Sequence, residues 1–109
     1  MGYPTDEEFR VGRACSTPRE RREKLESDYD NILADVGKEL KRAADLGFGL
    51  FNSAHEGFAI INEEFDELKA HVWTKQSKRD LKAMRKEAIE VAAMAVKFVE
   101  SMDAGAGRV

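Results

Sequence analysis

The sequence predicts an all-α fold, an antiparallel helical bundle of three long helices with a short N-terminal arm or helix. Apolar residues recur at three- and four-residue steps along three segments, which is a helix period, and no useful length of chain has the period of a strand. Charged residues make up 36% of the chain, which suits long solvent-facing helices. A length of 109 residues is enough for only one small domain. Because its hydrophobic core would be small, we expect oligomerisation to complete it.

The N-terminal sixteen residues are polar and mixed, and two interpretations stay open. They form a loose arm, or they form a short helix for which Thr5 and Glu8 supply a capping box. The first long helix begins after Thr17, a residue that can cap it, and ends near Leu46. Gly47 then offers the left-handed conformation that commonly closes a helix.

A short apolar loop with two glycines, residues 47–52, connects the first long helix to the second. It contains Phe48 and Phe51, and two interpretations of these side chains stay open. Either the loop tucks both phenylalanines into the core, or it is a flexible wall that contacts a flat ligand such as a nucleotide base.

The second long helix is expected from about Ala54 to Trp73. The spacing Ser-x-x-Glu at residues 53–56 is that of a capping box, which marks the start of the helix. Its apolar stripe centres on Phe65 and contains five residues: Phe58, Ile61, Phe65, Leu68 and Val72.

The last long helix is expected to open at Ser77 or Lys78 and to end near Met102. Its stripe centres on Ala88 and contains six residues: Leu81, Met84, Ala88, Ala92, Ala95 and Val99. Several of these residues are small, so a neighbouring helix can approach closely.

We therefore expect an N-terminal arm over 1–16, a single all-α domain over 17–102 and a flexible tail over 103–109. Cys15 is the only cysteine, so no intrachain disulfide forms, and a cytoplasmic location is expected. No apolar run approaches the roughly 20 residues of a membrane span, and no signal peptide is visible. The net charge of -3 argues against a general nucleic-acid binder.

Four glutamates form two pairs of equal spacing, Glu64 with Glu67 on the second long helix and Glu87 with Glu90 on the last. Each residue advances a helix by about 100°. With the two stripes centred as above, the first acid of each pair lies about 100° to one side and the second about 160° to the same side. Antiparallel helices can turn these pairs toward each other or apart, and both outcomes stay open.

Four clustered carboxylates cannot all stay ionised in one place without a cation. The set is oxygen-only, without cysteine or paired histidine, and suits Mg²⁺ or Mn²⁺ rather than zinc or copper. Our hypothesis is that the four glutamates hold Mg²⁺ for phosphate chemistry; the alternative is that they are solvated helix faces. Glu63 falls on the opposite, solvent side and has a secondary role at most.

Several other residues are candidates for binding a nucleotide. Lys82 and Lys86 lie near the start of the last helix, and Lys97 lies one heptad beyond the second acid pair, so all three are candidate phosphate ligands. Their alternative role is solubility. His55 and Trp73 share an edge of the second helix and are candidate base contacts. The alternatives are local hydrogen bonding for His55 and a core or interface position for Trp73.

The glutamates also carry a family resemblance. Glu63-Glu64-x-x-Glu67 followed by Glu87-x-x-Glu90 resembles the E-E-x-x-E … E-x-x-D signature of the MazG-like all-α nucleoside triphosphate pyrophosphohydrolases. Residues 55–68 and 86–95 are similar to the small phage and bacterial members, and the resemblance covers roughly residues 50–102. Glu90 stands where the family usually has Asp.

The resemblance implies an enzyme that converts a (d)NTP to the monophosphate and pyrophosphate through metal-activated water. It implies that the four glutamates are the Mg²⁺ ligands and that the chain assembles as a homodimer or homotetramer. Glu64 or Glu67, beside the metal, could then act as the general base. One alternative is a non-catalytic oligomerisation or partner-binding module of the same fold. A weaker one is nucleic-acid binding through Lys75–Lys86.

Overall fold

The computed structural model describes residues 17–108, so the expected N-terminal arm with its Thr5–Glu8 capping box lies outside the described residues. Over this range the chain is all-helical, with α2 (Pro18–Asp45), α3 (Ala54–Val72), η2 (Gln76–Lys78), α4 (Leu81–Asp103) and η3 (Ala106–Arg108). The chain forms two compact units, Met1–Ile32 and Leu33–Val109, and every feature of the candidate site belongs to the second. Among the helices described, none combines the length and the apolar character needed to cross a membrane.

The two ends of α2 follow the sequence prediction. At its start, the Glu20 amide donates to Thr17 Oγ1 at 3.0 Å, and the Thr17 amide donates to Glu20 Oε2 at 3.1 Å, which completes a capping box. At its end, Gly47 has a φ of 91°. The Phe48 amide then donates to the Ala43 carbonyl at 3.0 Å, as in a Schellman motif.

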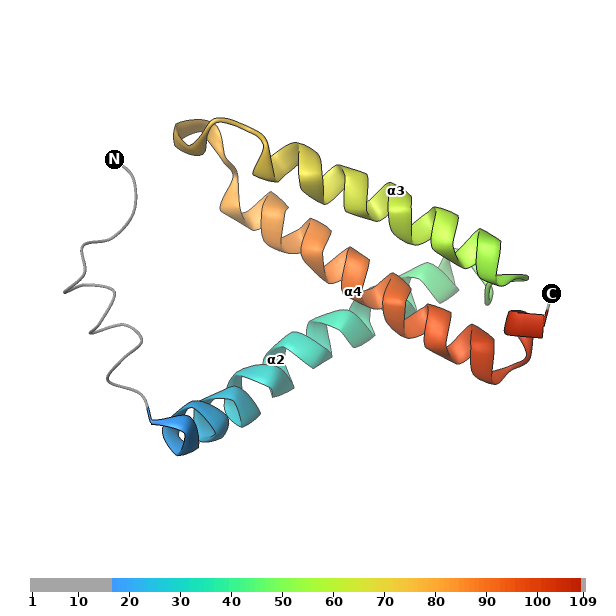
Figure 1. Ribbon diagram of the computed structural model, residues 1–109, viewed down its shortest axis with the longest axis horizontal. Helices are drawn as coiled ribbons and strands as arrows, with labels where there is room; N and C mark the ends of the chain where they lie inside the picture. Colours follow the sequence, from blue (N-terminus) through green and yellow to red (C-terminus); the bar gives the residue numbers. More distant parts are fainter. Residues whose placement is uncertain (1–16, 109) are drawn as a thin grey trace. The chain divides into compact units, whose positions relative to one another are not determined.

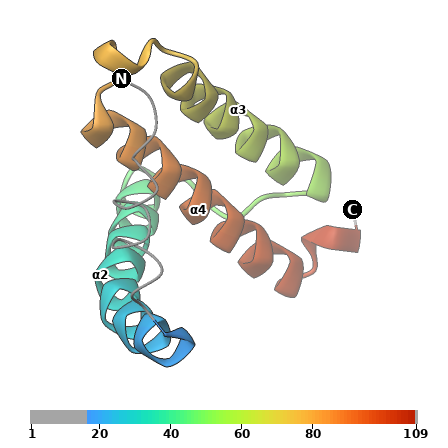
Figure 2. The same cartoon turned by 60° about the vertical axis from the view of Figure 1, so that its left-hand side comes forward.

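Helices α3 and α4 lie side by side and run in opposite directions, as Figures 1 and 2 both show. Ser53 caps α3 as expected, because its side chain accepts a hydrogen bond from the Glu56 amide. The expected start of α4 at Ser77 or Lys78 is wrong, because these residues belong to η2. Asp80 caps α4 instead, and its Oδ1 accepts from two backbone amides of the first turn.

The core of the second unit joins α3 and α4 to the C-terminal part of α2 and to the loop that follows it. Four buried residues form its centre: Val36, Phe51, Ala93 and Met94. An ion pair between Arg85 Nη2 and Asp35 Oδ2, at 2.7 Å, adds a polar contact between α4 and α2. The loop between α2 and α3 is therefore held against the middle of the fold.

The apolar stripes expected for α3 and α4 coincide only in part with the faces on which these helices pack, since Ile61 and Ala92 contact the core while other stripe residues are exposed. Phe58 and Phe65 of α3 are 67% and 54% exposed, and Leu81 and Val99 of α4 are also exposed. Gly57 is buried, by contrast, because α3 approaches α4 closely there. A hydrophobic pattern locates apolar side chains, but it does not tell whether a partner covers them.

The loop and the tail each differ from one expectation. Phe51 is 6% exposed and its amide donates to the buried Ser101 Oγ at 3.0 Å, so the core interpretation holds for this residue. It is wrong for Phe48, which is 63% exposed. The tail is not frayed over its described part, because Gly105 at a φ of 101° reverses the chain and Ala106 is buried.

We expect Gly57→Ala to destabilise the protein. A Cβ at this position would lie 2.7 Å from Phe98 Cδ2 and 2.9 Å from Phe51 Cδ2, so both rings would have to move. Overpacking typically costs about 1–3 kcal/mol, and the better helix propensity of Ala recovers about 1 kcal/mol of it. Gly37→Ala is the matched control, since a Cβ there meets nothing within 4 Å and should stabilise α2. Urea denaturation followed by circular dichroism measures both, and equal effects would contradict the packing argument.

Candidate functional site

The four glutamates of α3 and α4 converge. One carboxylate oxygen from each of Glu64, Glu67, Glu87 and Glu90 lies within 4.8 Å of the other three. The sequence left open whether the two pairs turn toward each other, and the antiparallel arrangement of the helices brings them together.

Three of the four acids, Glu64, Glu87 and Glu90, lie in the packed faces of the helices, while Glu67 is exposed. On α3, Glu64 shares its face with four residues that fall within about 40° of it, all of them buried or half-buried: Gly57, Ile60, Leu68 and His71. On α4, Glu87 and Glu90 lie within about 40° of buried Met94. Glu64 and Glu87, the first acid of each pair, were expected about 100° away from the packed face of their helix. This expectation is wrong, because the angle was measured from Phe65 and Ala88, which are not at the centre of the packed faces.

Two carboxylate oxygens of the cluster are buried without a hydrogen bond to replace the water that they lose. Glu64 Oε2 and Glu87 Oε2 are inaccessible to solvent and have no hydrogen-bond partner among the described residues. A buried polar atom normally finds a partner, and an ionised one that lacks it is costly. The cluster therefore favours any species that brings positive charge or protons between the helices.

Two acids of the cluster, Glu64 and Glu87, hold protons far more tightly than free glutamates do. Burial raises the pKa of Glu64 to about 7, and the nearby carboxylates of Glu90 and Glu67 add to the effect. Burial likewise raises the pKa of Glu87 to about 7, again with the help of Glu90 and Glu67. Burial and mutual repulsion both disfavour the fully ionised cluster.

The residues present fit a divalent cation. Carboxylate oxygens are the ligands that Mg²⁺, Mn²⁺ and Ca²⁺ prefer. Oxygens on opposite sides of a bound Mg²⁺ are about 4.2 Å apart, slightly less than the 4.8 Å span of the cluster, so a small side-chain rotation closes the set. The orphaned oxygens of Glu64 and Glu87 would gain the partner that they lack.

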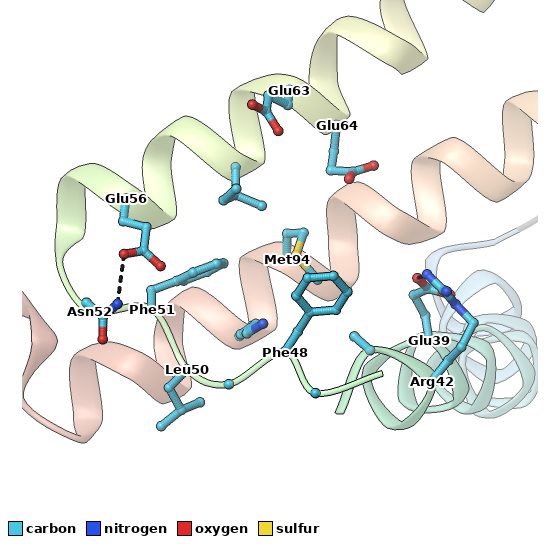
Figure 3. A pocket seen from close by; sticks show the side chains of 15 residues that line it. Glu39, Arg42, Phe48, Leu50, Phe51, Asn52, Glu56, Glu63, Glu64 and Met94 are labelled. Atoms are coloured by element: carbon cyan, nitrogen blue, oxygen red, sulfur yellow. Dashed lines mark hydrogen bonds and ion pairs between the residues drawn. The ribbon is translucent and has the colours of Figure 1, made fainter. Parts of the chain in front are cut away.

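A pocket of about 450 Å³ lies beside the cluster and reaches Glu64. Figure 3 shows Glu64 and Glu63 on α3 at one end of it, with Glu56 and Asn52 at the other and Phe48 projecting from the loop. Its lining comes from the end of α2, the loop, α3 and α4. A pocket of this size is in the range that holds small organic ligands.

A second hollow, a groove of about 270 Å³, reaches the cluster at Glu90. Five of its lining residues are basic: Lys38, Arg42, Lys82, Arg85 and Lys86. Lys86 Nζ lies 3.9 Å from Glu90 Oε1. The ion pair of Glu39 with Arg42 lines both the pocket and the groove, so the two hollows adjoin.

The remaining predicted site residues lie in different places. Lys82 and Lys86 line the basic groove, and Lys97 lines the pocket with Glu64. Glu63 is exposed, as expected, but it borders the pocket. His55 and Trp73 stand at opposite ends of α3, and neither lines the pocket or the groove. The expected core position of Trp73 is wrong, because this side chain is 75% exposed.

No sequence pattern singled out the α2 residues at the site or the Asn52–Glu56 pair. Glu39 and Arg42 have the i, i+3 spacing of a helical ion pair, but so do many exposed pairs. Glu56 was assigned to the capping box, whereas its Oε2 accepts a hydrogen bond from Asn52 Nδ2 at 3.1 Å. These residues join the site only through the tertiary fold.

Comparison of the chain with protein-family models, with curated proteins and with solved structures gives no match, so the family resemblance stands on the glutamate motifs alone.

We expect the metal-free protein to lose stability as the pH rises through this cluster's titration. The folded-state pKa of Glu64 and of Glu87 is about 7, against 4.5 for the free group, so folding favours their protonated forms. That stability is fully present below pH 4.5 and is lost as the pH rises to about 7. In the Glu87→Gln variant this position cannot ionise. The stability of the variant relative to the wild type should therefore increase as the pH rises across this window.

Urea denaturation in the presence of a chelator, at steps across the same pH window, measures the difference. Glu26→Gln, on the exposed surface of α2, is the control and should track the wild type. A constant difference between Glu87→Gln and the wild type at every pH would contradict the burial of these carboxylates.

Proposed function

We propose that this chain is a cytoplasmic Mg²⁺-dependent nucleoside triphosphate pyrophosphohydrolase, which converts a (d)NTP to the (d)NMP and pyrophosphate. The observation that carries the proposal is the convergence of four glutamates, two of which have buried oxygens without a partner. Glu64, Glu67, Glu87 and Glu90 would hold the metal. The resemblance of their spacing to the MazG-like signature supports this assignment, with Glu90 in the place of the usual Asp.

The two hollows beside the cluster support cleavage between the α and β phosphates. The pocket combines apolar side chains, among them Phe48, Phe51 and Ile60, with charged ones, and it has the size for a nucleoside. The basic groove offers Lys82 and Lys86 to the negative charge of the leaving pyrophosphate. The carboxylates reach both hollows, through Glu64 on one side and Glu90 on the other. The α phosphate would therefore lie at the cluster.

The protein's own residues then have distinct roles. Glu67 is the most exposed of the four acids, so it is the best placed to take the proton from the attacking water. Glu64 and Glu87 are held by the packed helix faces and fix the position of the reacting group. When bound, Mg²⁺ would neutralise the charge of the phosphates and lower the pKa of a coordinated water.

The exposed apolar side of the α3–α4 pair supports the assembly of a bundle from two or more chains. Phe58 and Phe65 on α3 and Leu81 and Val99 on α4 all expose large apolar surfaces. On each helix these residues lie roughly 100–140° from the packed face, measured in the same rotational direction along the chain. Because the two helices are antiparallel, both sets then lie on the same side of the pair. Covering this side would complete the thin core. We propose that a second copy of the chain covers it.

The first prediction of this proposal concerns activity. The wild-type protein should release pyrophosphate from at least one (d)NTP in the presence of Mg²⁺ and none in the presence of a chelator. Glu67→Gln should lower kcat by about 10²- to 10⁴-fold, the usual contribution of a general base. Glu64→Gln should abolish release, and Glu26→Gln should behave as the wild type.

A pyrophosphate assay over all common NTPs and dNTPs measures this. A protein that is inert toward every nucleotide and binds neither Mg²⁺ nor Mn²⁺ would eliminate the enzyme. The alternative of a non-catalytic module with the same fold fails if the melting temperature rises clearly when Mg²⁺ and a nucleotide are added together.

The second prediction concerns self-association. Phe65→Lys places a charge on the proposed interface and should shift the protein to the monomer without loss of helix content. Leu46→Lys alters an exposed apolar residue just after α2 and is the control. Light scattering during gel filtration measures the molar mass of each variant. A wild-type protein that is monomeric at every concentration would contradict the interface.

A further inference from the structure

The pocket beside the acid cluster is chemically different at its two ends. Near Glu64 it meets the carboxylates of the cluster, while its far end is bordered by Asn52 and Glu56. Between them lie apolar walls from Phe51, Ile60 and other core residues. A ligand held by the cluster would extend into this far end.

The mouth of the pocket carries an exposed aromatic ring. Phe48 lies between Gly47 and Gly49, remains 63% exposed and lines the pocket. A large apolar side chain that borders a cavity without being buried has contact area left for a flat ligand. The ligand-wall interpretation of the loop therefore stays open for Phe48, while Phe51 belongs to the core.

The far end of the pocket presents an exposed hydrogen-bond acceptor, Glu56. Glu56 Oε2 accepts a hydrogen bond from Asn52 Nδ2 at 3.1 Å, and Figure 3 shows this pair beside Phe51. A carboxylate has about four acceptor positions, so one hydrogen bond from Asn52 leaves the others for a ligand. The bond also holds the carboxylate in one orientation.

The same pocket contains a lysine that is largely buried as a residue, while its ammonium nitrogen keeps access to solvent. Lys97 is 8% exposed, and its Nζ lies 5.0 Å from the centre of the Phe51 ring. Among the described residues, the Lys97 ammonium has no carboxylate within ion-pair distance and no hydrogen-bond acceptor of its own. Lysine is rarely buried without a charged partner, so this ammonium is available to an acceptor that enters the pocket.

The spacing of these groups suits a nucleoside monophosphate. Glu64 lies eight positions after Glu56, which is a rise of about 12 Å along α3. A phosphate at Glu64 would thus place its base near Glu56 and Lys97, with Phe48 beside the ring.

We propose that this pocket is a nucleoside subsite that selects guanine, with Glu56 as the acceptor and Lys97 as the donor; this rests on the proposed function. Guanine carries two adjacent N–H donors, which match a carboxylate, beside the O6 and N7 acceptors that lysine commonly binds. Adenine and cytosine offer one amino group beside a ring acceptor. Uracil and thymine place carbonyl oxygens on both sides of their single N–H, and one of these would face the carboxylate.

The test combines hydrolysis with binding. Pyrophosphate release is measured for all common NTPs and dNTPs, and binding of GMP, AMP, CMP and UMP is measured by calorimetry. We expect the guanine nucleotides to have the highest kcat/KM and GMP the tightest binding. Glu56→Gln should reduce the preference for guanine over adenine by about 10- to 100-fold, as expected for loss of a charged hydrogen bond. Lys97→Met, which keeps the apolar stem, should weaken GMP binding, and Glu26→Gln should change nothing.

The outcomes separate the two proposals. Pyrophosphate release without a guanine preference, or with a preference that Glu56→Gln leaves intact, overturns the guanine subsite and leaves the enzyme standing. Selective GMP binding that Glu56→Gln abolishes, without pyrophosphate release from any nucleotide, supports the subsite and overturns the enzyme. Unaltered helix content of each variant by circular dichroism shows that its effect is not unfolding.

Discussion

Four carboxylates that converge from two antiparallel helices, three of them partly buried, are the constraint on which the rest of this structure depends. Glu64 and Glu87 occupy positions on α3 and α4 that an ordinary helical pair would fill with leucine or isoleucine. Their oxygens are withdrawn from water and lack hydrogen-bond partners among the described residues. The raised pKa of both groups has the same origin, namely burial among like charges. An arrangement that lowers stability in this way is typical of a functional site rather than of a structural core.

The two sides of the glutamate cluster have different chemical surroundings. On one side lies a pocket with apolar walls, and on the other lies a groove with five basic residues. The ion pair of Glu39 and Arg42 on α2 lines both hollows, so the second half of this helix forms part of the site. A ligand with an apolar end, a charged middle and a strongly anionic tail matches this sequence of environments, and a nucleoside triphosphate has that form.

The sequence predicted the helices well because local signals mark their ends. Thr17 with Glu20, Gly47 and Ser53 each satisfy backbone groups within a few residues, and such signals do not depend on the rest of the fold. The start of α4 was missed because the capping residue Asp80 was overlooked, and the helix was expected to open at Ser77 or Lys78 instead. The packed faces were missed for a different reason. Phe58 and Phe65 were placed in the apolar stripe of the second helix, yet both are exposed, while Gly57 is buried and Glu64 is half-buried. Only the tertiary contact of α3 with α4 distinguishes an apolar residue that packs within the chain from one left exposed.

Ser101 gives the pocket one further property. Its fully buried hydroxyl accepts a hydrogen bond from the Phe51 amide at 3.0 Å and donates one to the Lys97 carbonyl at 2.7 Å. A single oxygen thus fastens the interhelical loop to the same turn of α4 that carries the lysine. The positions of the Phe51 ring and of the Lys97 ammonium therefore both depend on Ser101. We therefore expect the loop and the Lys97 side chain to move together if the loop is displaced.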